Sequence, residues 1–125
     1  DFFTPNETET EFYLNKKIES DQDIKDAGNE FLDKGVKNII ITLGSKGVYF
    51  ANSNESYFID ALKLKSDVVD TTGAGDAFNG ALCVALAKDY DYKNALIFAN
   101  KVGGISTTKV GAANAMPTIK EVESY

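Results

Sequence analysis

The sequence contains no histidine, and this absence removes several familiar kinds of active site. Without an imidazole the chain cannot build a Ser-His or Cys-His nucleophile pair, or a metal site that depends on histidine. Cysteine is almost as scarce, because Cys83 is the only one. An internal disulfide is therefore impossible, which fits a reducing compartment such as the cytoplasm. Cys83 stands among alanine, leucine and valine, so we expect a buried helical thiol rather than a reactive one.

Positive charge and long apolar runs are also in short supply. Lysine and arginine number 13 against 19 aspartates and glutamates, which gives a formal net charge of −6. This balance argues against a general nucleic-acid surface, because phosphate backbones are held by clustered basic side chains. No apolar run approaches the ~20 residues of a membrane span, and no targeting segment is visible. We therefore expect a cytoplasmic protein with neither a nucleic-acid nor a membrane partner.

What the chain does contain points to an α/β domain. Its 125 residues, of which 43% are hydrophobic, can bury a core of moderate size. Apolar residues at helical spacing over 21–34 precede a β-branched run over 36–43, as in a strand buried on both faces of a parallel sheet. Further strands are expected at 48–51 and 57–59. Residues 1–6 look like the end of a strand with no strand before it, so the chain looks cut.

The most informative stretch is Asp70-Thr71-Thr72-Gly73-Ala74-Gly75-Asp76-Ala77-Phe78-Asn79-Gly80, where a β-rich segment meets a long apolar helix. Gly73 and Gly75 permit backbone conformations that a Cβ would penalise, so successive N–H groups around Ala74 can turn toward one point. The first N–H groups and the dipole of the helix add to this anion site, which suits a phosphate. Asp76 beside it could accept a proton from a hydroxyl that attacks the phosphate. The alternative is that Asp76 merely caps the helix and the glycines merely make a turn.

This stretch resembles the signature of the ribokinase-like (PfkB) family of carbohydrate kinases, Asp-Thr-x-(Gly or Ala)-Ala-Gly-Asp-x-Phe-x-Gly. The resemblance implies a three-layer α/β sandwich with a mostly parallel central sheet, a β-hairpin and flanking helices. It also implies ATP-dependent phosphorylation of a sugar hydroxymethyl group, with ribose to ribose 5-phosphate as the first expectation. Asp76 would be the base, and the N–H groups of Gly73, Ala74 and Gly75 would stabilise charge on the transferring phosphoryl group.

A second motif lies near the start of the chain, where Thr4-Pro5-Asn6-Glu7-Thr8-Glu9 opens a helix expected to reach about Leu14. Asn6 and Glu9 have the spacing of a capping box, and capping alone would explain them. The same residues match the Asn-x-x-Glu motif that ribokinase-like enzymes use for phosphate and hydrated magnesium. Both roles can coexist.

Two further segments resemble parts of the ATP site in the family. The first consists of Thr42, Leu43, Gly44, Ser45, Lys46 and Gly47, for which a tight turn between strands is the plain alternative. The second is Asn100, which lies in a helix that Asp91 can cap and falls where the adenine edge is approached in the family. An exposed helical asparagine is the alternative for Asn100.

A cation loop is implied after this helix, which Gly103 and Gly104 are expected to loosen. In the resembling enzymes the loop holds a monovalent cation beside the anion site. Carried over to this chain, the ligands are the carboxylate of Asp70 and the carbonyls of Thr72, Ser106, Lys109 and Gly111, a set that suits potassium. Ala115 stands where ribokinases often have a serine, so a water would replace that hydroxyl or the cation dependence would be weaker.

The resemblance covers nearly the whole chain and identifies residues 1–125 as one domain, the C-terminal, nucleotide-binding portion of such a kinase. The sugar-binding half and the β-sheet lid, which also mediates dimerisation, would precede Asp1. Alone, the chain should phosphorylate little or nothing. Its uncovered sheet edge and apolar surface should favour association with itself or with the missing segment, and the full-length enzyme is expected to be a homodimer.

Two other functions stay open. One is a related kinase that acts on fructose, a nucleoside or a vitamin precursor, because the residues that select the sugar are mostly absent from this chain. The other is a non-catalytic nucleotide-binding or assembly module. The presence of Asp76 argues against the module, because a pure nucleotide sensor has no need of a base beside a phosphate.

Overall fold

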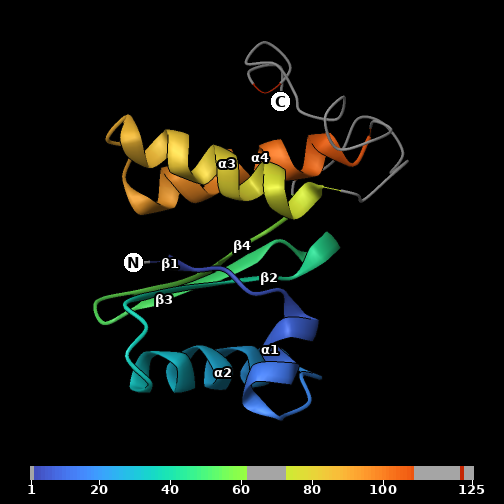
Figure 1. Ribbon diagram of the computed structural model, residues 1–125, viewed down its shortest axis with the longest axis vertical. Helices are drawn as coiled ribbons and strands as arrows, with labels where there is room; N and C mark the ends of the chain where they lie inside the picture. Colours follow the sequence, from blue (N-terminus) through green and yellow to red (C-terminus); the bar gives the residue numbers. More distant parts are fainter. Residues whose placement is uncertain (1, 62–72, 109–121, 123–125) are drawn as a thin grey trace. The chain divides into compact units, whose positions relative to one another are not determined.

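The structure is a computed structural model that describes residues 2–61, 73–108 and 122 (Figure 1). The chain divides into two compact units, Asp1–Asp60 and Ala61–Tyr125. Among the described residues, the first unit holds a sheet with two α-helices, and the second unit holds the helices α3 (Ala74–Ala87) and α4 (Tyr92–Ser106).

The sheet of the first unit has four strands in the order β1-β2-β3-β4 and carries α1 and α2 on one face (Figure 1). In chain order the elements are β1 (Phe2–Phe3), α1 (Glu7–Leu14), α2 (Asp21–Asp33), β2 (Asn38–Thr42), the short 3₁₀ helix η1 (Gly44–Lys46), β3 (Val48–Asn52) and β4 (Ser56–Ile59). The helix predicted over 21–34 and the strands predicted over 36–43, 48–51 and 57–59 are thereby confirmed, with bounds that shift by one or two residues.

The α/β class and the hairpin are as predicted, but the strands of this part of the chain are not mostly parallel. β1 is parallel to β2, whereas β3 is antiparallel to both β2 and β4. The reason lies in the connections: β2, β3 and β4 are joined by short turns, which allow only antiparallel pairing. The one parallel pair, β1 and β2, is joined by a long crossover that contains α1 and α2.

The core of the first unit is built on β2. Ile39, Ile40 and Ile41 are all fully buried, as the continuous β-branched run predicts. Burying each of these side chains contributes roughly 1.5–3 kcal/mol. Ile39 and Ile41 share one cluster with Leu43, which follows β2, and with buried residues of both helices and β3, namely Leu14, Ile24, Ala27, Phe31, Tyr49 and Ala51.

A glycine lets α2 approach the sheet closely. Gly28 is buried on α2, and a Cβ built there would lie 2.8 Å from Cε2 of Tyr49, whose ring on β3 is itself buried. Since atoms at that distance overlap, the ring would have to move to admit a side chain. Gly28 therefore sets the distance between α2 and β3.

The described part of the second unit contains an antiparallel helix pair, α3 (Ala74–Ala87) and α4 (Tyr92–Ser106), joined by a short connection (Figure 1). Asp91 is the N-cap of α4, as predicted, and its Oδ1 accepts the N–H of Asn94 at 2.7 Å. The buried residues of α3 are Ala77, Phe78, Ala81, Leu82 and Ala85. None of the helices in the described ranges has both the length and the apolar character that crossing a membrane requires.

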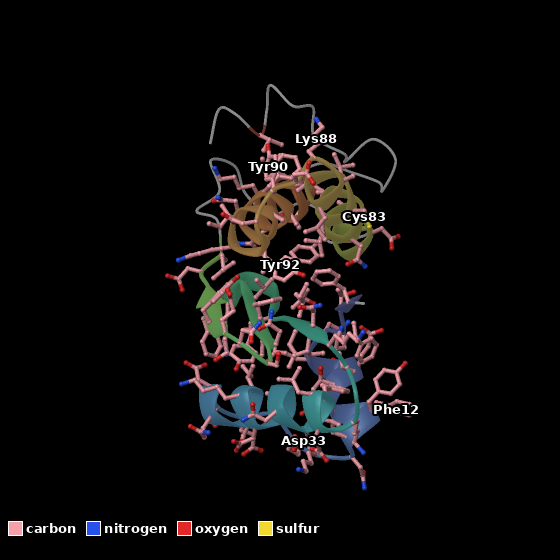
Figure 2. All side chains as sticks on the ribbon, turned by 90° about the vertical axis from the view of Figure 1, so that its left-hand side faces the viewer. Phe12, Asp33, Cys83, Lys88, Tyr90 and Tyr92 are labelled. Atoms are coloured by element: carbon pink, nitrogen blue, oxygen red, sulfur yellow. The ribbon has the colours of Figure 1, made fainter. Side chains whose placement is uncertain are left out.

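The prediction of a buried thiol at Cys83 is wrong, because the structure leaves Cys83 exposed (Figure 2). The neighbouring Val84 is also half exposed. Successive residues of a helix are 100° apart, so an apolar run that is continuous in sequence cannot all face the same side. The buried face of α3 is set by Ala77, Ala81 and Ala85, and Cys83 lies away from it.

We predict that Gly28→Ala lowers the free energy of unfolding by about 1 kcal/mol, because the overpacking of Tyr49 outweighs the better helix propensity of alanine. Gly80→Ala is the matched control, since Gly80 lies on the exposed face of α3 with open space at its Cβ position. The control should raise stability by about 0.5–1 kcal/mol. Urea denaturation followed by circular dichroism measures both, and equal effects of the two changes would contradict the close contact.

Candidate functional site

In the first unit, predicted nucleotide residues gather at the carboxyl ends of β1 and β2. Asn6 follows β1 and Thr42 ends β2, and the two form an isolated parallel bridge. The N–H of Thr42 also donates to the carbonyl of Pro5 at 3.0 Å. Ligands of open α/β sheets bind outside the carboxyl ends of parallel strands. The start of α1 and the turn that follows β2 therefore emerge side by side where such a ligand would lie.

Asn6 and Glu9 form the capping box that their spacing predicts. The Asn6 Oδ1 accepts the N–H of Glu9 at 2.7 Å, and the Glu9 Oε1 accepts the N–H of Asn6 at 2.9 Å. Both residues are exposed. The box uses neither the amide NH₂ of Asn6 nor the second carboxylate oxygen of Glu9. The capping role is thus confirmed, and it leaves one donor and one acceptor group for the predicted contact with phosphate and hydrated magnesium.

The turn after β2 is a single 3₁₀ turn held by glycines at both ends. Gly44 and Gly47 have φ values of 59° and 101°, which L side chains rarely adopt. The N–H of Leu43 donates to the carbonyl of Gly47 at 2.9 Å and closes the turn. Because Leu43 is buried while Ser45 and Lys46 are exposed, the turn presents its tip to solvent. The tight turn is therefore confirmed, and contact of Thr42, Gly44, Ser45, Lys46 and Gly47 with a nucleotide stays a prediction.

In the second unit, α3 begins without a side-chain cap. Gly73 is its N-cap with φ 78°, and the first intrahelical bond runs from the N–H of Ala77 to the carbonyl of Gly73 at 2.9 Å. The N–H groups of Ala74, Gly75 and Asp76 precede that bond and point out of the helix start. The other described α-helices begin with capping side chains, from Asn6, Ser20 and Asp91. Among the described α-helices, only α3 begins without a side chain that accepts a backbone N–H at its N-cap.

Gly73 and Gly75 have different roles in this motif. Gly73 adopts the left-handed conformation that the sequence predicts. Gly75 does not, because it lies within the first turn of α3 and has no positive φ. A Cβ at Gly75 would meet nothing within 4 Å, and the residue is exposed. The absence of a side chain at Gly75 therefore leaves the helix start open to a ligand and does not relieve backbone strain.

Asp76 is exposed in the first turn of α3. The proposal that it only caps the helix is wrong in the strict sense, because the N-cap position belongs to Gly73 and no side-chain capping bond is made. A carboxylate in a first turn is still favoured by the helix dipole. Asp76 is thus accessible to solvent in the same turn as the uncapped amides, which is the position that a general base requires.

The C-terminal end of α4 differs from the prediction. The helix does not loosen at Gly103 and Gly104 but continues to Ser106, which is its last residue. The hydroxyl of the buried Ser106 donates to the carbonyl of Gly103 at 2.7 Å. Thr107 and Thr108 donate in the same way to the carbonyls of Gly104 and Ile105, at 2.6 and 2.7 Å. The carbonyls of Gly104 and Ile105 also accept the N–H groups of Thr107 and Thr108, at 3.1 and 3.0 Å, so amides and hydroxyls together satisfy this helix end.

The antiparallel pairing brings the start of α3 and the end of α4, which holds Ser106, to the same end of the helix pair. Gly103 on α4 lies against Ala74 on α3. A helix start attracts anions and a helix end attracts cations. Asn100 is half buried further back on α4, and its predicted contact with adenine stays a prediction.

Five residues of the predicted cation site lie outside the described residues: Asp70, Thr72, Lys109, Gly111 and Ala115. Within the described ranges, no group of three acidic, histidine or cysteine side chains is placed to hold a metal ion. The potassium site therefore stays a prediction, of which only Ser106 can be placed.

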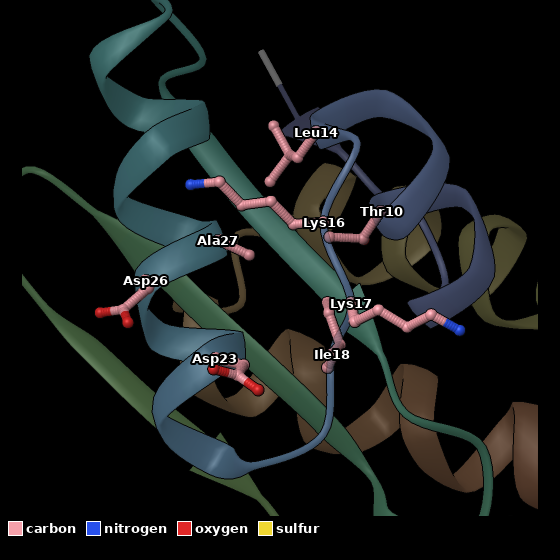
Figure 3. Close-up of a pocket in the computed structure, with 8 residues that line it drawn as sticks. All are labelled: Thr10, Leu14, Lys16, Lys17, Ile18, Asp23, Asp26 and Ala27. Carbon is pink, nitrogen blue, oxygen red and sulfur yellow. The ribbon is translucent and has the colours of Figure 1, made fainter.

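A pocket of about 90 Å³ in the first unit contains no predicted site residue (Figure 3). It is lined by residues of α1, α2 and the segment between them, among them Lys16, Lys17, Asp23 and Asp26. Lys16 forms an ion pair with Glu30 at 2.9 Å, and this hydrogen bond and charge raise the pKa of Lys16. Asp23 accepts the N–H of Glu19 at 2.9 Å. Asp26 accepts the side-chain amide of Gln22 at 2.9 Å, so Lys16, Asp23 and Asp26 each have a partner within the chain.

Sequence reasoning missed Gly103 as a contact with the helix start at Ala74. The signal was present, since Ala95, Ala99 and Gly103 are small, buried and four residues apart. Such spacing places them on one face of α4. Only the structure shows which part of α3 lies against the last of them.

Comparison with known proteins finds relatives that match nearly the whole chain. The sequence profile of a family described as pfkB family carbohydrate kinase matches residues 1–119. A ribokinase of Staphylococcus aureus is 42% identical over 98% of this chain, and one of Haemophilus influenzae is 37% identical over 100% of it. The match covers 40% of each relative, so the chain spans less than half the length of these proteins.

Solved structures show the same fold. A ribokinase of Thermotoga maritima matches 99% of the chain with a TM-score of 0.87 and 39% identity. The ribokinase of Arabidopsis thaliana, solved with ribose and ATP, matches 99% with a TM-score of 0.92 and 32% identity. A protein termed ribokinase II from Escherichia coli, solved with ATP and Mg²⁺, matches with a TM-score of 0.82 and 29% identity. These matches cover about two fifths of each structure, namely 41%, 40% and 38%.

We predict that Asn6→Ala costs about 1 kcal/mol of stability, because the N–H of Glu9 loses its acceptor. Ser20→Ala is the control, since Ser20 caps α2 through the N–H of Asp23 at 3.1 Å. Thermal and urea unfolding should show similar losses for both variants. A loss at Ser20 with none at Asn6 would mean that the capping box does not stabilise α1.

Proposed function

Because the chain belongs to the pfkB family of carbohydrate kinases, we propose that it is the nucleotide-binding, C-terminal portion of a sugar kinase. The reaction is transfer of the γ-phosphoryl group of ATP to a sugar hydroxymethyl group, with D-ribose as the first candidate. Relatives named ribokinase and the Arabidopsis structure with ribose and ATP support this choice. The observation that carries it is the exposed Asp76 carboxylate beside the amides at the uncapped start of α3.

The chemistry assigned to α3 is proton transfer and charge stabilisation. Asp76 accepts the proton of the sugar hydroxyl as its oxygen attacks the γ-phosphorus. The new phosphorus–oxygen bond forms while the bond to the bridging β-phosphate oxygen breaks, and that oxygen leaves with the electron pair as part of ADP. The N–H groups of Gly73, Ala74 and Gly75, together with the positive end of α3, stabilise the charge on the transferring group. Positioning and electrostatics supply the catalysis.

The first unit is assigned to the nucleotide. The amide NH₂ of Asn6 would donate to a phosphate, and the second oxygen of Glu9 would accept from water bound to Mg²⁺, an ion that keeps several waters in such sites. Bound Mg²⁺ neutralises charge on the phosphates. The turn formed by Gly44, Ser45, Lys46 and Gly47 would contact the nucleotide. Asn100 keeps its predicted role at the adenine.

The described residues fit a monovalent cation at one point. Ser106 ends α4, so its carbonyl lies at the negative end of the helix, and the carbonyls of the three preceding residues already accept hydroxyls. A carbonyl of this kind suits a weakly hydrated ion such as potassium. The proposed set adds Asp70, Thr72, Lys109 and Gly111, with Ala115 as the position that lacks a hydroxyl.

The rest of the proposal concerns the whole protein. Residues that select the sugar, and the lid through which two copies pair, are assigned to sequence before Asp1, and the chain alone is expected to be nearly inactive. The single cysteine fits a location in the cytoplasm. The full-length product of the gene is therefore the protein to assay.

We predict that Asp76→Asn lowers kcat by roughly 10²–10⁴ in that product, which is the usual effect of removing a general base. The assay couples ADP release to NADH oxidation, with ribose, deoxyribose, fructose and a nucleoside as acceptors. Asp89→Asn is the control, because Asp89 is exposed beyond the other end of α3 and its φ of 63° suits asparagine.

The acceptor panel separates the remaining functions. Activity with fructose or the nucleoside but not ribose would replace the first candidate by a related kinase. A protein that binds Mg·ADP and phosphorylates none of the four would favour the non-catalytic module. A kcat that is unchanged in Asp76→Asn would remove Asp76 from the role of base.

We also predict that potassium raises the activity of the full-length product more than sodium at equal ionic strength. The physical reason is that several neutral carbonyls match the larger, less hydrated ion. Rates measured in matched chloride salts test this, with a tetramethylammonium salt as the control for ionic strength. Equal rates in all three salts would dismiss the cation site.

A further inference from the structure

We propose that Gly103 is a positioning residue for the phosphate site. Its missing side chain lets the last turn of α4 lie against the first turn of α3, and this contact fixes where the amides at the start of α3 point. The proposal rests on the proposed function, since it concerns the same helix start.

The contact is made with the backbone of α3 itself. A Cβ built at Gly103 would lie 3.3 Å from the carbonyl oxygen of Ala74 and 3.4 Å from Cβ of Phe78. Ala74 is the first residue of α3, and its N–H is one of the three that precede the first intrahelical bond. A side chain at Gly103 therefore pushes on the turn that carries those amides.

The last turn of α4 is held by more contacts than the first turn of α3. Val102 and Ile105 are buried in the second unit, and the hydroxyl of Ser106, which is 1% exposed, donates to the carbonyl of Gly103 at 2.7 Å. By contrast, Gly75 is exposed, and no capping side chain holds the start of α3. A side chain at Gly103 is thus accommodated by displacement of α3 at its start.

The rest of the helix pair supports a close approach. Ala95, Ala99 and Gly103 lie four residues apart on α4, and Ala77, Ala81 and Ala85 do so on α3, all of them buried. Small residues at this spacing form a ridge along one face of each helix. Gly103 ends its ridge with the smallest residue, at the end of the pair that carries Asp76.

The test compares Gly103→Val with Gly103→Ala in the full-length product of the gene, at a temperature where circular dichroism shows both to be folded. The controls are Gly80→Val and Gly80→Ala, because Gly80 lies on α3 with nothing within 4 Å of its Cβ position. Two quantities are measured, kcat with ATP and hydrogen exchange at the N–H of Ala77, which bonds to Gly73.

We expect Gly103→Val to lower kcat about tenfold, since misplacement of catalytic groups by a fraction of an ångström has effects of this order. Exchange at Ala77 should become faster, while exchange in the last turn of α3 stays as it was. Gly103→Ala should show both effects more weakly, and the two Gly80 variants should show neither. A role in stability alone would lower the melting temperature and leave kcat at the working temperature unchanged.

Two results would overturn the proposal while the kinase assignment stands: wild-type kcat in Gly103→Val, or unchanged exchange at Ala77. A wild-type protein that neither binds Mg·ADP nor phosphorylates a sugar would overturn the proposed function itself, and the role of Gly103 with it.

Discussion

Amide groups without partners at the start of α3 are the constraint on which the second unit depends. A helix start always leaves such groups, and proteins usually satisfy them with a side chain, as Asn6, Ser20 and Asp91 do for the other described α-helices. The start of α3 has Gly73 instead. Gly73 can adopt the positive φ of the turn, but it has no side chain that could accept a hydrogen bond from an amide. With glycine at the N-cap, the motif forgoes roughly a few tenths of a kcal/mol of capping stability relative to serine, aspartate or asparagine. A bound phosphate would supply the missing acceptors, and this supports the proposal that the protein transfers phosphoryl groups.

The start of α1 in the first unit, by contrast, is capped by side chains. At α1 the side chains of Asn6 and Glu9 satisfy each other's backbone, and this fixes both side chains at the carboxyl ends of β1 and β2. A site built in this way loses little conformational entropy when a ligand binds, because the contacts that orient it exist beforehand. Capping and ligand binding therefore do not compete at Asn6 and Glu9.

Much of this could be predicted from the sequence, and the failures have physical reasons. Strong local signals identified the buried β2, the capping residue Asp91 and the turn at Gly44–Gly47. Cys83 and Gly75 were predicted incorrectly, because an apolar run does not say which side of a helix is buried and a glycine does not say whether it serves conformation or access. The end of α4 was expected to loosen at Gly103 and Gly104, since the hydroxyl bonds of Ser106, Thr107 and Thr108 that extend it cannot be read from a sequence. The contact of Gly103 with Ala74 depends on tertiary packing and was not predicted at all.

The most direct test of the central claim is an NMR titration of the full-length product, labelled with ¹⁵N-glycine, with Mg²⁺ and a non-hydrolysable ATP analogue. The N–H groups that face a phosphate shift strongly on binding, whereas glycines remote from it do not. We predict large shifts at Gly73 and Gly75, and little change at Gly28 and Gly80. Saturation by the nucleotide with no shift at Gly73 or Gly75 would contradict the claim that the start of α3 receives the phosphate.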